Sequence, residues 1–263
     1  MSGLVLTQRR GQLVEIILNR ADKRNAINWD MMLEFEKVLR EIENSSGIRA
    51  ILIRGEGSGF SAGIDLAAFP QTSDYFGENW RKNLFPLTSA YQQIISRFER
   101  CSIPTIALLH GYCLGLGFEL ALACDFRIAA EGTNIGLPET KIGIIPDVGG
   151  TTRLTRLVGV ARAKEIIMTG KFVDLLHAEQ WGLVNYVVPP DELLATGERL
   201  ANDLAQAAPL AVSYAKRVID GITDVERGFQ LEAWAQSQLI QSEDFEAGIQ
   251  AFLLKQTPQW KGK

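Results

Sequence analysis

The chain has little histidine, little cysteine and no excess of positive charge. Among its 263 residues there are two histidines and three cysteines, and 27 Lys and Arg stand against 31 Asp and Glu, for a formal net charge of −4. So few potential ligands argue against a metal site. The mild acidity argues against a broad nucleic-acid surface, which needs clustered basic residues. The three cysteines are Cys101, Cys113 and Cys124. A disulfide framework needs more cysteines and an even number of them, so the sequence favours buried free thiols and a cytoplasmic location.

Signals for secretion or membrane insertion are also missing. The chain reaches Gln8, Arg9 and Arg10 before any long apolar run, which is not the pattern of a secretory signal. The segment from Cys101 to Phe118 carries no Asp, Glu, Lys or Arg over about the 18 residues that a membrane helix needs. It also contains Pro104 and several glycines, so the sequence predicts a strand followed by a buried helix, and no membrane span.

The glycine-rich segments do not match the motifs of common nucleotide-binding or hydrolase folds. Neither the glycines at 55, 57 and 59 nor those at 115 and 117 have the spacing of a dinucleotide-binding fingerprint. A P-loop and a Gly-x-Ser-x-Gly nucleophile elbow are both missing, and Ser61 has no obvious histidine partner. These absences argue against a nucleotide-binding protein and against a serine hydrolase.

What is present is an ordinary globular composition, 46% apolar and 22% charged, in a chain long enough for one large domain with a helical appendage. Apolar runs predict strands at 4–7, 13–18, 49–54, 103–110, 126–130 and 183–188. Helical patterns cover 29–44, 78–100, 114–124, 151–158, 161–169 and 178–181, and then 191–207, 210–220, 225–241 and 244–255. Asn28 and Asp191 are favourable N-caps for two of these helices. The sequence therefore predicts an α/β region over 1–190 and a helical region over 191–263.

Three loops combine glycines with acidic residues, at 55–65, 111–119 and 139–150. Glycine lets the backbone approach a ligand and present its N–H groups, and two converging N–H groups can stabilise an oxyanion. Glu119, Glu139 and Asp147 lie in or beside these loops, where acid–base catalysis is plausible chemistry. The structural alternatives are a helix N-terminal charge for Glu119 and turn positions for the other two, and spacing alone leaves both open.

Four motifs, in order along nearly the whole chain, resemble the enoyl-CoA hydratase/isomerase (crotonase) superfamily. They are Leu18–Ala26 (LNRADKRNA), Gly59–Leu66 (GFSAGIDL), His110–Asp125 (HGYCLGLGFELALACD) and Pro138–Thr151 (PETKIGIIPDVGGT). The resemblance implies an α/β fold, a crotonase-like spiral of ββα turns that holds the active site over 1–190. It also implies that the helical region over 191–263 drives assembly into homotrimers, or into hexamers of two trimers.

The resemblance further implies an enoyl-CoA hydratase, which adds water across the 2,3 double bond of trans-2-enoyl-CoA to give 3-hydroxyacyl-CoA. In that mechanism the backbone N–H groups of Ala62 and Leu116 bind the thioester oxygen. Glu119 and Glu139 form the acid–base pair that activates water at Cβ and protonates Cα. No metal or redox cofactor is implied, because coenzyme A is part of the substrate.

Asp147 departs from the hydratase pattern. Hydratases commonly have glycine at this position, whereas dienoyl-CoA isomerases have aspartate there. Those isomerases usually have aspartate at the position of Glu119 as well, so this chain combines two patterns. The alternative function is an enoyl- or dienoyl-CoA double-bond isomerase that uses Asp147. Two alternatives of other classes are a non-catalytic acyl-CoA-binding protein and a thioester hydrolase.

The resemblance also assigns the substrate-binding segments. Lys23, Arg24 and Ala26 occupy the positions that meet the nucleotide and pantetheine end of coenzyme A. The positions near the adenine and the thioester are Ala62, Gly63, Ile64, Asp65, Leu66 and Gly115. The segment over 67–87 carries four aromatic residues that either form a wall of the acyl pocket or belong to the ordinary core: Phe69, Tyr75, Phe76 and Trp80.

Overall fold

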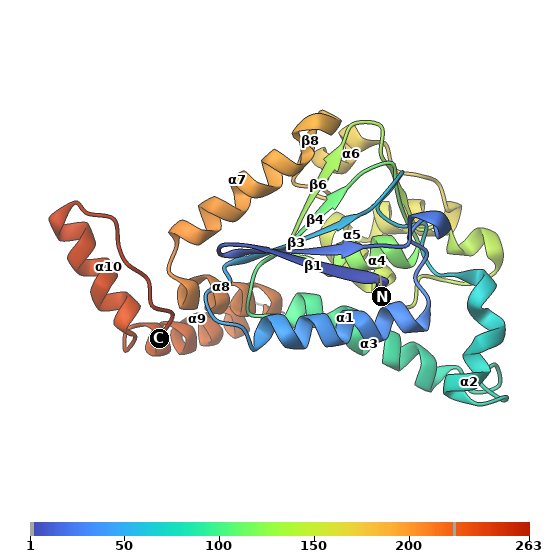
Figure 1. Cartoon of the computed structure of the whole chain (residues 1–263), viewed down its shortest axis with the longest axis horizontal. Helices are drawn as coiled ribbons and strands as arrows, with labels where there is room; N and C mark the ends of the chain where they lie inside the picture. Colours follow the sequence, from blue (N-terminus) through green and yellow to red (C-terminus); the bar gives the residue numbers. More distant parts are fainter. Residues whose placement is uncertain (1–2, 223–224) are drawn as a thin grey trace.

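The computed structural model describes residues 3–222 and 225–263, and within these residues the main sheet has six strands in the order β1-β2-β3-β4-β6-β8 (Figure 1). Their bounds are β1 Val5–Arg10, β2 Leu13–Leu18, β3 Ala50–Gly55, β4 Thr105–Leu109, β6 Phe126–Ala130 and β8 Tyr186–Val188. β1 and β2 form an antiparallel hairpin, and all the later pairings are parallel. The central strands are buried on both faces, as their continuous apolar runs predict.

A second, two-stranded sheet pairs β5 (Tyr112–Leu114) with β7 (Asn134–Gly136) in parallel. The predicted helix over 114–124 is therefore too long at its start, and α4 runs only over Leu116–Leu122. Residues 112–114 are extended because they find a partner strand twenty residues further along the chain. Between β5 and α4 the chain turns at Gly115, whose φ of 51° is a left-handed conformation that favours glycine.

Apart from the short α2, which the sequence analysis does not predict, the helices within the described residues follow the predicted order. They are α1 Trp29–Glu43, α2 Thr72–Phe76, α3 Phe85–Arg100, α5 Gly150–Thr169, α6 Leu175–Gln180, α7 Leu193–Gln206, α8 Pro209–Gly221, α9 Val225–Leu239 and α10 Glu243–Leu254. Asn28 caps α1, accepting a hydrogen bond from the Met31 N–H at 3.1 Å, as predicted. Asp191 does not cap α7. It lies in a 3₁₀ turn over Pro190–Glu192, and α7 begins without a side-chain cap.

One helix boundary differs from the prediction for an identifiable reason. The helix predicted over 78–100 begins only at Phe85, because the preceding residues form turns. The two helices predicted at 151–158 and 161–169 are the two helical segments of α5, which a kink separates at Gly159, where φ is 76°.

The sheet lies between two layers of helices (Figure 1). One face packs against α1, α3 and α4, with large buried side chains such as Phe35, Phe98 and Phe118. The other face packs against α7, where Leu193 and Ala201 contact residues of β3, β4 and β6. The first helix after residue 190 thus covers the sheet, while α8, α9 and α10 extend to one side of it. The domain division after residue 190 stays a prediction.

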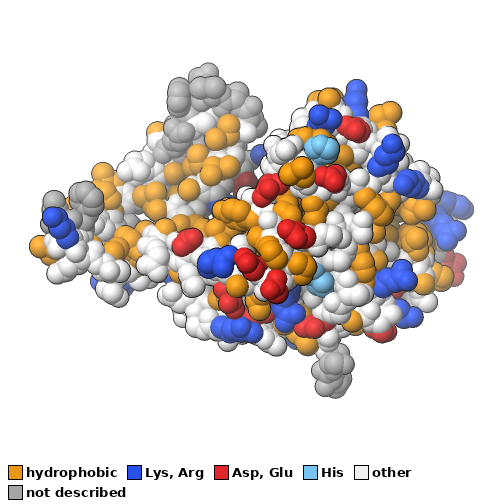
Figure 2. All heavy atoms as spheres, turned by 90° about the horizontal axis from the view of Figure 1, so that it is seen from above, with side chains coloured by type: hydrophobic (Ala, Val, Ile, Leu, Met, Phe, Trp, Pro, Cys, Tyr) orange, Lys and Arg blue, Asp and Glu red, His pale blue; other side chains and the backbone are white. Residues whose placement is uncertain are grey.

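The C-terminal helices carry exposed apolar side chains. Figure 2 shows hydrophobic groups along this extension, and the large exposed ones include Ile219 of α8 and Phe245, Ile249 and Leu254 of α10. Assembly of the chain into trimers through this region stays a prediction. Among the described residues no helix is long and apolar enough to span a membrane.

A buried ion pair fixes α8 to the sheet. Lys216 is 8% exposed, and its Nζ lies 2.7 Å from Asp125 Oδ2 and 3.2 Å from the Phe98 carbonyl oxygen. Asp125 also accepts hydrogen bonds from the N–H and the hydroxyl of Thr105. Removing one partner of such a pair leaves the other charge buried and uncompensated.

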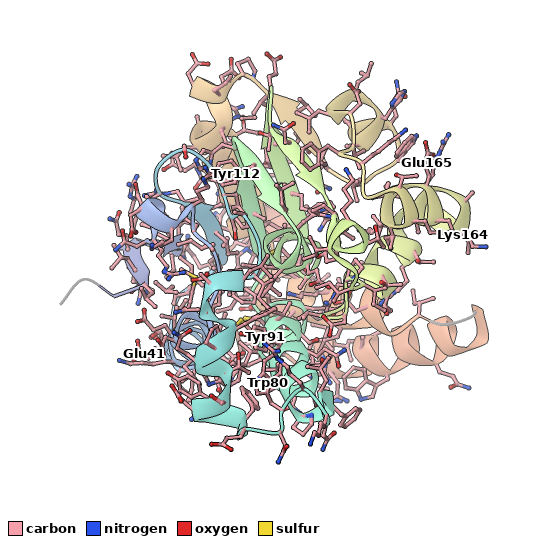
Figure 3. The ribbon with its side chains drawn as sticks, turned by 90° about the vertical axis from the view of Figure 1, so that its right-hand side faces the viewer. Glu41, Trp80, Tyr91, Tyr112, Lys164 and Glu165 are labelled. Carbon is pink, nitrogen blue, oxygen red and sulfur yellow. The ribbon has the colours of Figure 1, made fainter. Side chains whose placement is uncertain are left out.

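We expect Lys216→Met to lower the free energy of unfolding by about 3 kcal/mol, because the Asp125 carboxylate loses its cation. Urea unfolding followed by circular dichroism measures this change. Lys164→Met, at an exposed position of α5 (Figure 3), is the control and should change stability by less than about 0.5 kcal/mol. Equal unfolding midpoints for the two variants would contradict the role of the ion pair.

Candidate active site

The loop over 59–65 is held by the first predicted motif, 18–26. The buried amide of Asn25 donates to the carbonyl oxygens of Glu56 and Gly59, at 2.8 and 2.9 Å, and accepts from the Arg20 N–H. The Ser61 hydroxyl donates to the Asn25 carbonyl at 2.7 Å and accepts from the Gly63 N–H. Two motifs that are forty residues apart in sequence are therefore one structural unit.

The prediction that the Ala62 N–H binds the thioester oxygen is wrong for this structure. That N–H already donates to the Arg24 carbonyl at 3.0 Å. Arg24 has a φ of 55°, and this left-handed turn directs its carbonyl toward the loop. The Ala62 N–H is therefore not available to a ligand.

The neighbouring N–H of Ile64 is available instead. Ile27 donates to the Gly63 carbonyl and accepts from the Asp65 N–H, so in this parallel bridge the N–H of Ile64 points to the opposite side. Among the described residues it has no acceptor. A side-chain carbon on Gly63 would lie 3.4 Å from the Leu116 nitrogen, so this loop touches the start of α4.

The Leu116 N–H is the second available donor. Leu116 is the first residue of α4, where backbone N–H groups have no partner within the helix. The Leu116 N–H has no acceptor elsewhere among the described residues, whereas the preceding Gly115 N–H donates to the Gly136 carbonyl. The structure thus brings together two free amides, those of Ile64 and Leu116, on adjacent loops.

Glu119 lies on α4 and is 2% exposed. Its Oε1 accepts hydrogen bonds from the N–H groups of Val148 and Gly150, both at 2.8 Å. Burial raises the pKa of Glu119 to about 8, and the negative charges of Glu139 and Asp147 raise it too, against the two backbone hydrogen bonds, which lower it. Burial therefore favours the protonated form of Glu119, and the two hydrogen bonds connect it to the loop that carries Asp147.

Glu139 opens a 3₁₀ turn over Glu139–Ile142 and is 8% exposed. If residue 115 had a side-chain carbon, that carbon would lie 3.0 Å from Glu139 Oε1. Glycine at this position therefore leaves room for the carboxyl group. Its Oε2 is buried and has no hydrogen-bond partner among the described residues. Burial raises the pKa of Glu139 to about 7, and the charge of Asp147 adds to this effect.

Asp147 is half-buried and is held by α3. Its Oδ2 accepts a hydrogen bond from the Thr88 hydroxyl at 2.8 Å, and its carbonyl oxygen accepts from the Gln92 amide at 2.6 Å. Sequence reasoning missed Thr88 and Gln92. The two residues are four positions apart, so they lie on the same side of one helix. This spacing points to a functional role only when it is known that the loop of Asp147 faces that side of the helix.

Asp147 lies on a largely apolar cleft of about 830 Å³. Trp80 and Tyr91, both marked in Figure 3, line this cleft together with Phe69 and Ile64. The aromatic residues of the segment over 67–87 therefore divide into two groups. Phe69 and Trp80 line the cleft beside Asp147, and their role as an acyl-pocket wall stays a prediction.

The other two aromatic residues of that segment pack on α1. The rings of Tyr75 and Phe76 lie 6.4 and 4.9 Å from the ring of Trp29. They border a second cleft, of about 330 Å³, which shares Ile64, Phe69 and Tyr91 with the first. The two clefts therefore meet beside the free amide of Ile64.

The predicted coenzyme A residues are only partly gathered at the second cleft. Lys23, Ile64 and Asp65 line it. Asp65 is bound to Arg20 at 2.6 Å, so part of its role is structural.

The remaining predicted residues of this group do not line either cleft. Leu66 is 49% exposed, and the carbonyls of Arg24 and Ala26 are used in hydrogen bonds within the fold. Gly63 lies beside the Leu116 N–H, and Gly115 lies beside the carboxyl group of Glu139. These two glycines therefore shape the backbone of the site and do not line a cleft.

The comparison with known proteins identifies the family. The family model for enoyl-CoA hydratase/isomerase matches residues 8–263. The chain belongs to this family. A short-chain-enoyl-CoA hydratase from Clostridium acetobutylicum is 34% identical over 254 residues, covering 95% of each chain. A mitochondrial Delta(3,5)-Delta(2,4)-dienoyl-CoA isomerase from Dictyostelium discoideum is also 34% identical, over 95% of this chain and 87% of its own length.

A solved structure confirms the predicted fold class. The crystal structure of an enoyl-CoA hydratase from Bacillus anthracis superposes with a TM-score of 0.90 at 36% identity, covering 99% of this chain and 100% of that one. The chain is therefore a crotonase-type α/β protein of the enoyl-CoA hydratase/isomerase family. Hydratases and isomerases both occur among its relatives at similar identity, so the choice between the two activities depends on this site's own residues.

We expect Gly150→Ala to displace Glu119, because the new methyl group would lie 2.7 Å from Glu119 Oε1 and 2.9 Å from the Pro146 side chain. A crystal structure should show Glu119 without one of its two loop hydrogen bonds, and the unfolding free energy should fall by about 1–3 kcal/mol. Gly228→Ala in α9 is the control, since the nearest atom to its methyl group is 3.8 Å away. An unmoved Glu119 in the first variant would refute this packing argument.

Proposed function

We propose that the chain is an enoyl-CoA hydratase, which adds water across the 2,3 double bond of trans-2-enoyl-CoA to give 3-hydroxyacyl-CoA. The observation that carries this proposal is the buried Oε2 of Glu139 without a hydrogen-bond partner, next to a second buried carboxyl group. A buried polar atom needs a partner, and the attacking water supplies one. The raised pKa values of Glu119 and Glu139 allow one carboxyl to be protonated while the other is ionised.

In the proposed reaction the thioester oxygen accepts hydrogen bonds from the N–H groups of Ile64 and Leu116. Charge develops on this oxygen as water adds to Cβ, and each such donor contributes about 2.7–4 kcal/mol of transition-state stabilisation. The ionised carboxyl of the Glu119–Glu139 pair takes one proton from the water, and the protonated carboxyl delivers its proton to Cα. The water oxygen forms the new bond to Cβ. Which carboxyl starts protonated is left open, because the two titrate as a pair.

The substrate side of the proposal follows the two clefts. Lys23 lies at the edge of the second cleft, where a cation suits the phosphates of coenzyme A. The acyl chain occupies the apolar cleft lined by Phe69, Trp80 and Tyr91. Coenzyme A enters as part of the substrate, and no separate cofactor is part of the proposal.

The cellular location and the oligomeric state are proposed from other observations. The three cysteines are buried free thiols, which supports the cytoplasm, where disulfides are rare. A homotrimer, or a hexamer of two trimers, is proposed from the exposed apolar side chains of α8 and α10.

A double-bond isomerase is the second candidate, and Asp147 is the observation that favours it. Its carboxylate lines the acyl cleft, where it could move a proton along the acyl chain. The Dictyostelium discoideum relative bears an isomerase name. Incubation with crotonyl-CoA separates the two candidates by mass spectrometry. A product heavier by one water supports hydration, and conversion without a mass change supports isomerisation.

We expect Glu119→Gln and Glu139→Gln each to lower kcat for crotonyl-CoA hydration by about a hundred- to ten-thousand-fold, because each change removes a group that transfers a proton. Absorbance of the enoyl thioester and the product mass measure this. Glu165→Gln, on the exposed side of α5 (Figure 3), is the matched control and should leave kcat unchanged. Unaltered turnover in both active-site variants points to a non-catalytic binding protein, and release of free coenzyme A points to thioester hydrolysis.

We expect a bell-shaped pH profile of kcat/KM with limbs near pH 7 and 8, because activity needs one protonated and one ionised carboxyl. The charge of Asp147 raises the pKa of both glutamates, so Asp147→Asn should move both limbs to lower pH. Steady-state kinetics from pH 5 to 10 measure the shift. Limbs that stay in place, or move upward, would contradict the electrostatic role of Asp147.

A further inference from the structure

One face of α3 carries a polar stripe made of Thr88, Gln92, Ser96 and Glu99. Their spacing of four, four and three residues places them in one row along the helix. The other faces of α3 bury apolar residues such as Ile95 and Phe98 in the core. All four polar side chains of this row form hydrogen bonds with one segment, residues 147–153, and Glu99 also lies 3.9 Å from Arg156.

The members of the stripe bind that segment at two residues, Asp147 and Arg153. Thr88 binds the Asp147 side chain and Gln92 binds its carbonyl. Further along α3, Ser96 and Glu99 accept hydrogen bonds from Arg153, at 2.8 and 2.7 Å. Arg153 is 8% exposed, so this arrangement is built into the interior.

The segment held in this way also fixes the acid–base pair. Arg153 donates to the Val148 carbonyl at 3.1 Å, while the Val148 N–H donates to Glu119 at 2.8 Å. One short peptide segment therefore connects α3, Asp147 and Glu119. A change in how α3 binds Asp147 is therefore transmitted to Glu119 through a single residue, Val148.

The opposite end of the stripe touches the acyl cleft. Leu84, Leu87, Thr88 and Tyr91 line it, and they come from the first turns of α3 and the residue before it. Thr88 thus lines the same cleft as Asp147. Its hydroxyl donates to Oδ2 of the carboxylate, and such a donor restricts the rotation of the Asp147 side chain.

We propose that Thr88 is a positioning residue that acts through Asp147, and this inference rests on the hydratase function proposed above. By holding Oδ2, Thr88 keeps the third carboxylate on the α3 side of the cleft. The Glu119–Glu139 pair is then free to bind and activate the water. Without this hydrogen bond, the Asp147 carboxylate is free to compete for the water or for the proton of the pair.

The test is a double-mutant cycle on crotonyl-CoA hydration with Thr88→Val and Asp147→Ala. Thr88→Val should lower kcat about tenfold with KM nearly unchanged, since a hydrogen bond to a charged group is lost. Thr88→Ser, which keeps the hydroxyl, should restore kcat. Thr88→Val added to Asp147→Ala should change kcat less than about twofold, because the group it acts through is already gone.

Ser89→Ala is the matched control on the same helix, because the Ser89 hydroxyl binds Gln93 and not the active-site segment. If Thr88→Val does not fold by circular dichroism, Thr88→Ala replaces it, since it also removes the hydroxyl that donates to Asp147 Oδ2. It should show the same dependence on Asp147. An equal loss of kcat with and without the Asp147 carboxylate overturns the inference. A wild-type enzyme that never hydrates crotonyl-CoA overturns the proposed function itself.

Discussion

The two backbone hydrogen bonds to Glu119 are the interaction on which the rest of the site depends. Burying a carboxyl group is costly unless it is hydrogen-bonded or protonated, and Glu119 is both buried and bound by the N–H groups of Val148 and Gly150. The bonds can form only because residue 150 is glycine, since a methyl group there would strike the carboxyl. This single tether joins α4, the loop before α5 and, through that loop, α3. The geometry of Asp147 and the protonation of Glu119 are therefore linked.

The small second sheet positions the other half of the site. β5 pairs with β7 on one side, and Cys113 of β5 pairs with Ser61 on the other. The first pairing brings the segment before Glu139 beside Gly115, and the second brings the loop of Ile64 beside Leu116. Three segments remote in sequence thus meet around a three-residue strand. A geometry with two free amides next to two carboxyl groups results from backbone pairing, which most substitutions of the side chains leave intact.

Much of the fold could be predicted from the sequence because its signals are local. The apolar runs of β3, β4 and β6 and the Asn28 cap of α1 need only neighbouring residues, and the structure confirms them. The boundaries that failed depend on distant partners. Residues 112–114 are a strand only because 134–136 lie beside them. Likewise, the four family motifs coincide with the loops of the candidate site, but the motifs alone do not show which backbone N–H is free. Which amide binds a ligand depends on the left-handed turn at Arg24, which occupies the Ala62 N–H.

Asp147 shows why family membership leaves the chemistry open. Three carboxyl groups this close repel one another when they are ionised, and this repulsion adds to the effect of burial in raising the pKa values of Glu119 and Glu139. A third carboxylate is compatible with hydration only if its position is fixed, because a mobile one would compete with water for the same protons. The hydrogen bonds from Thr88 and Gln92 provide that restraint. In the proposed hydratase mechanism, then, the restraint that α3 places on Asp147 matters as much as which acids are present.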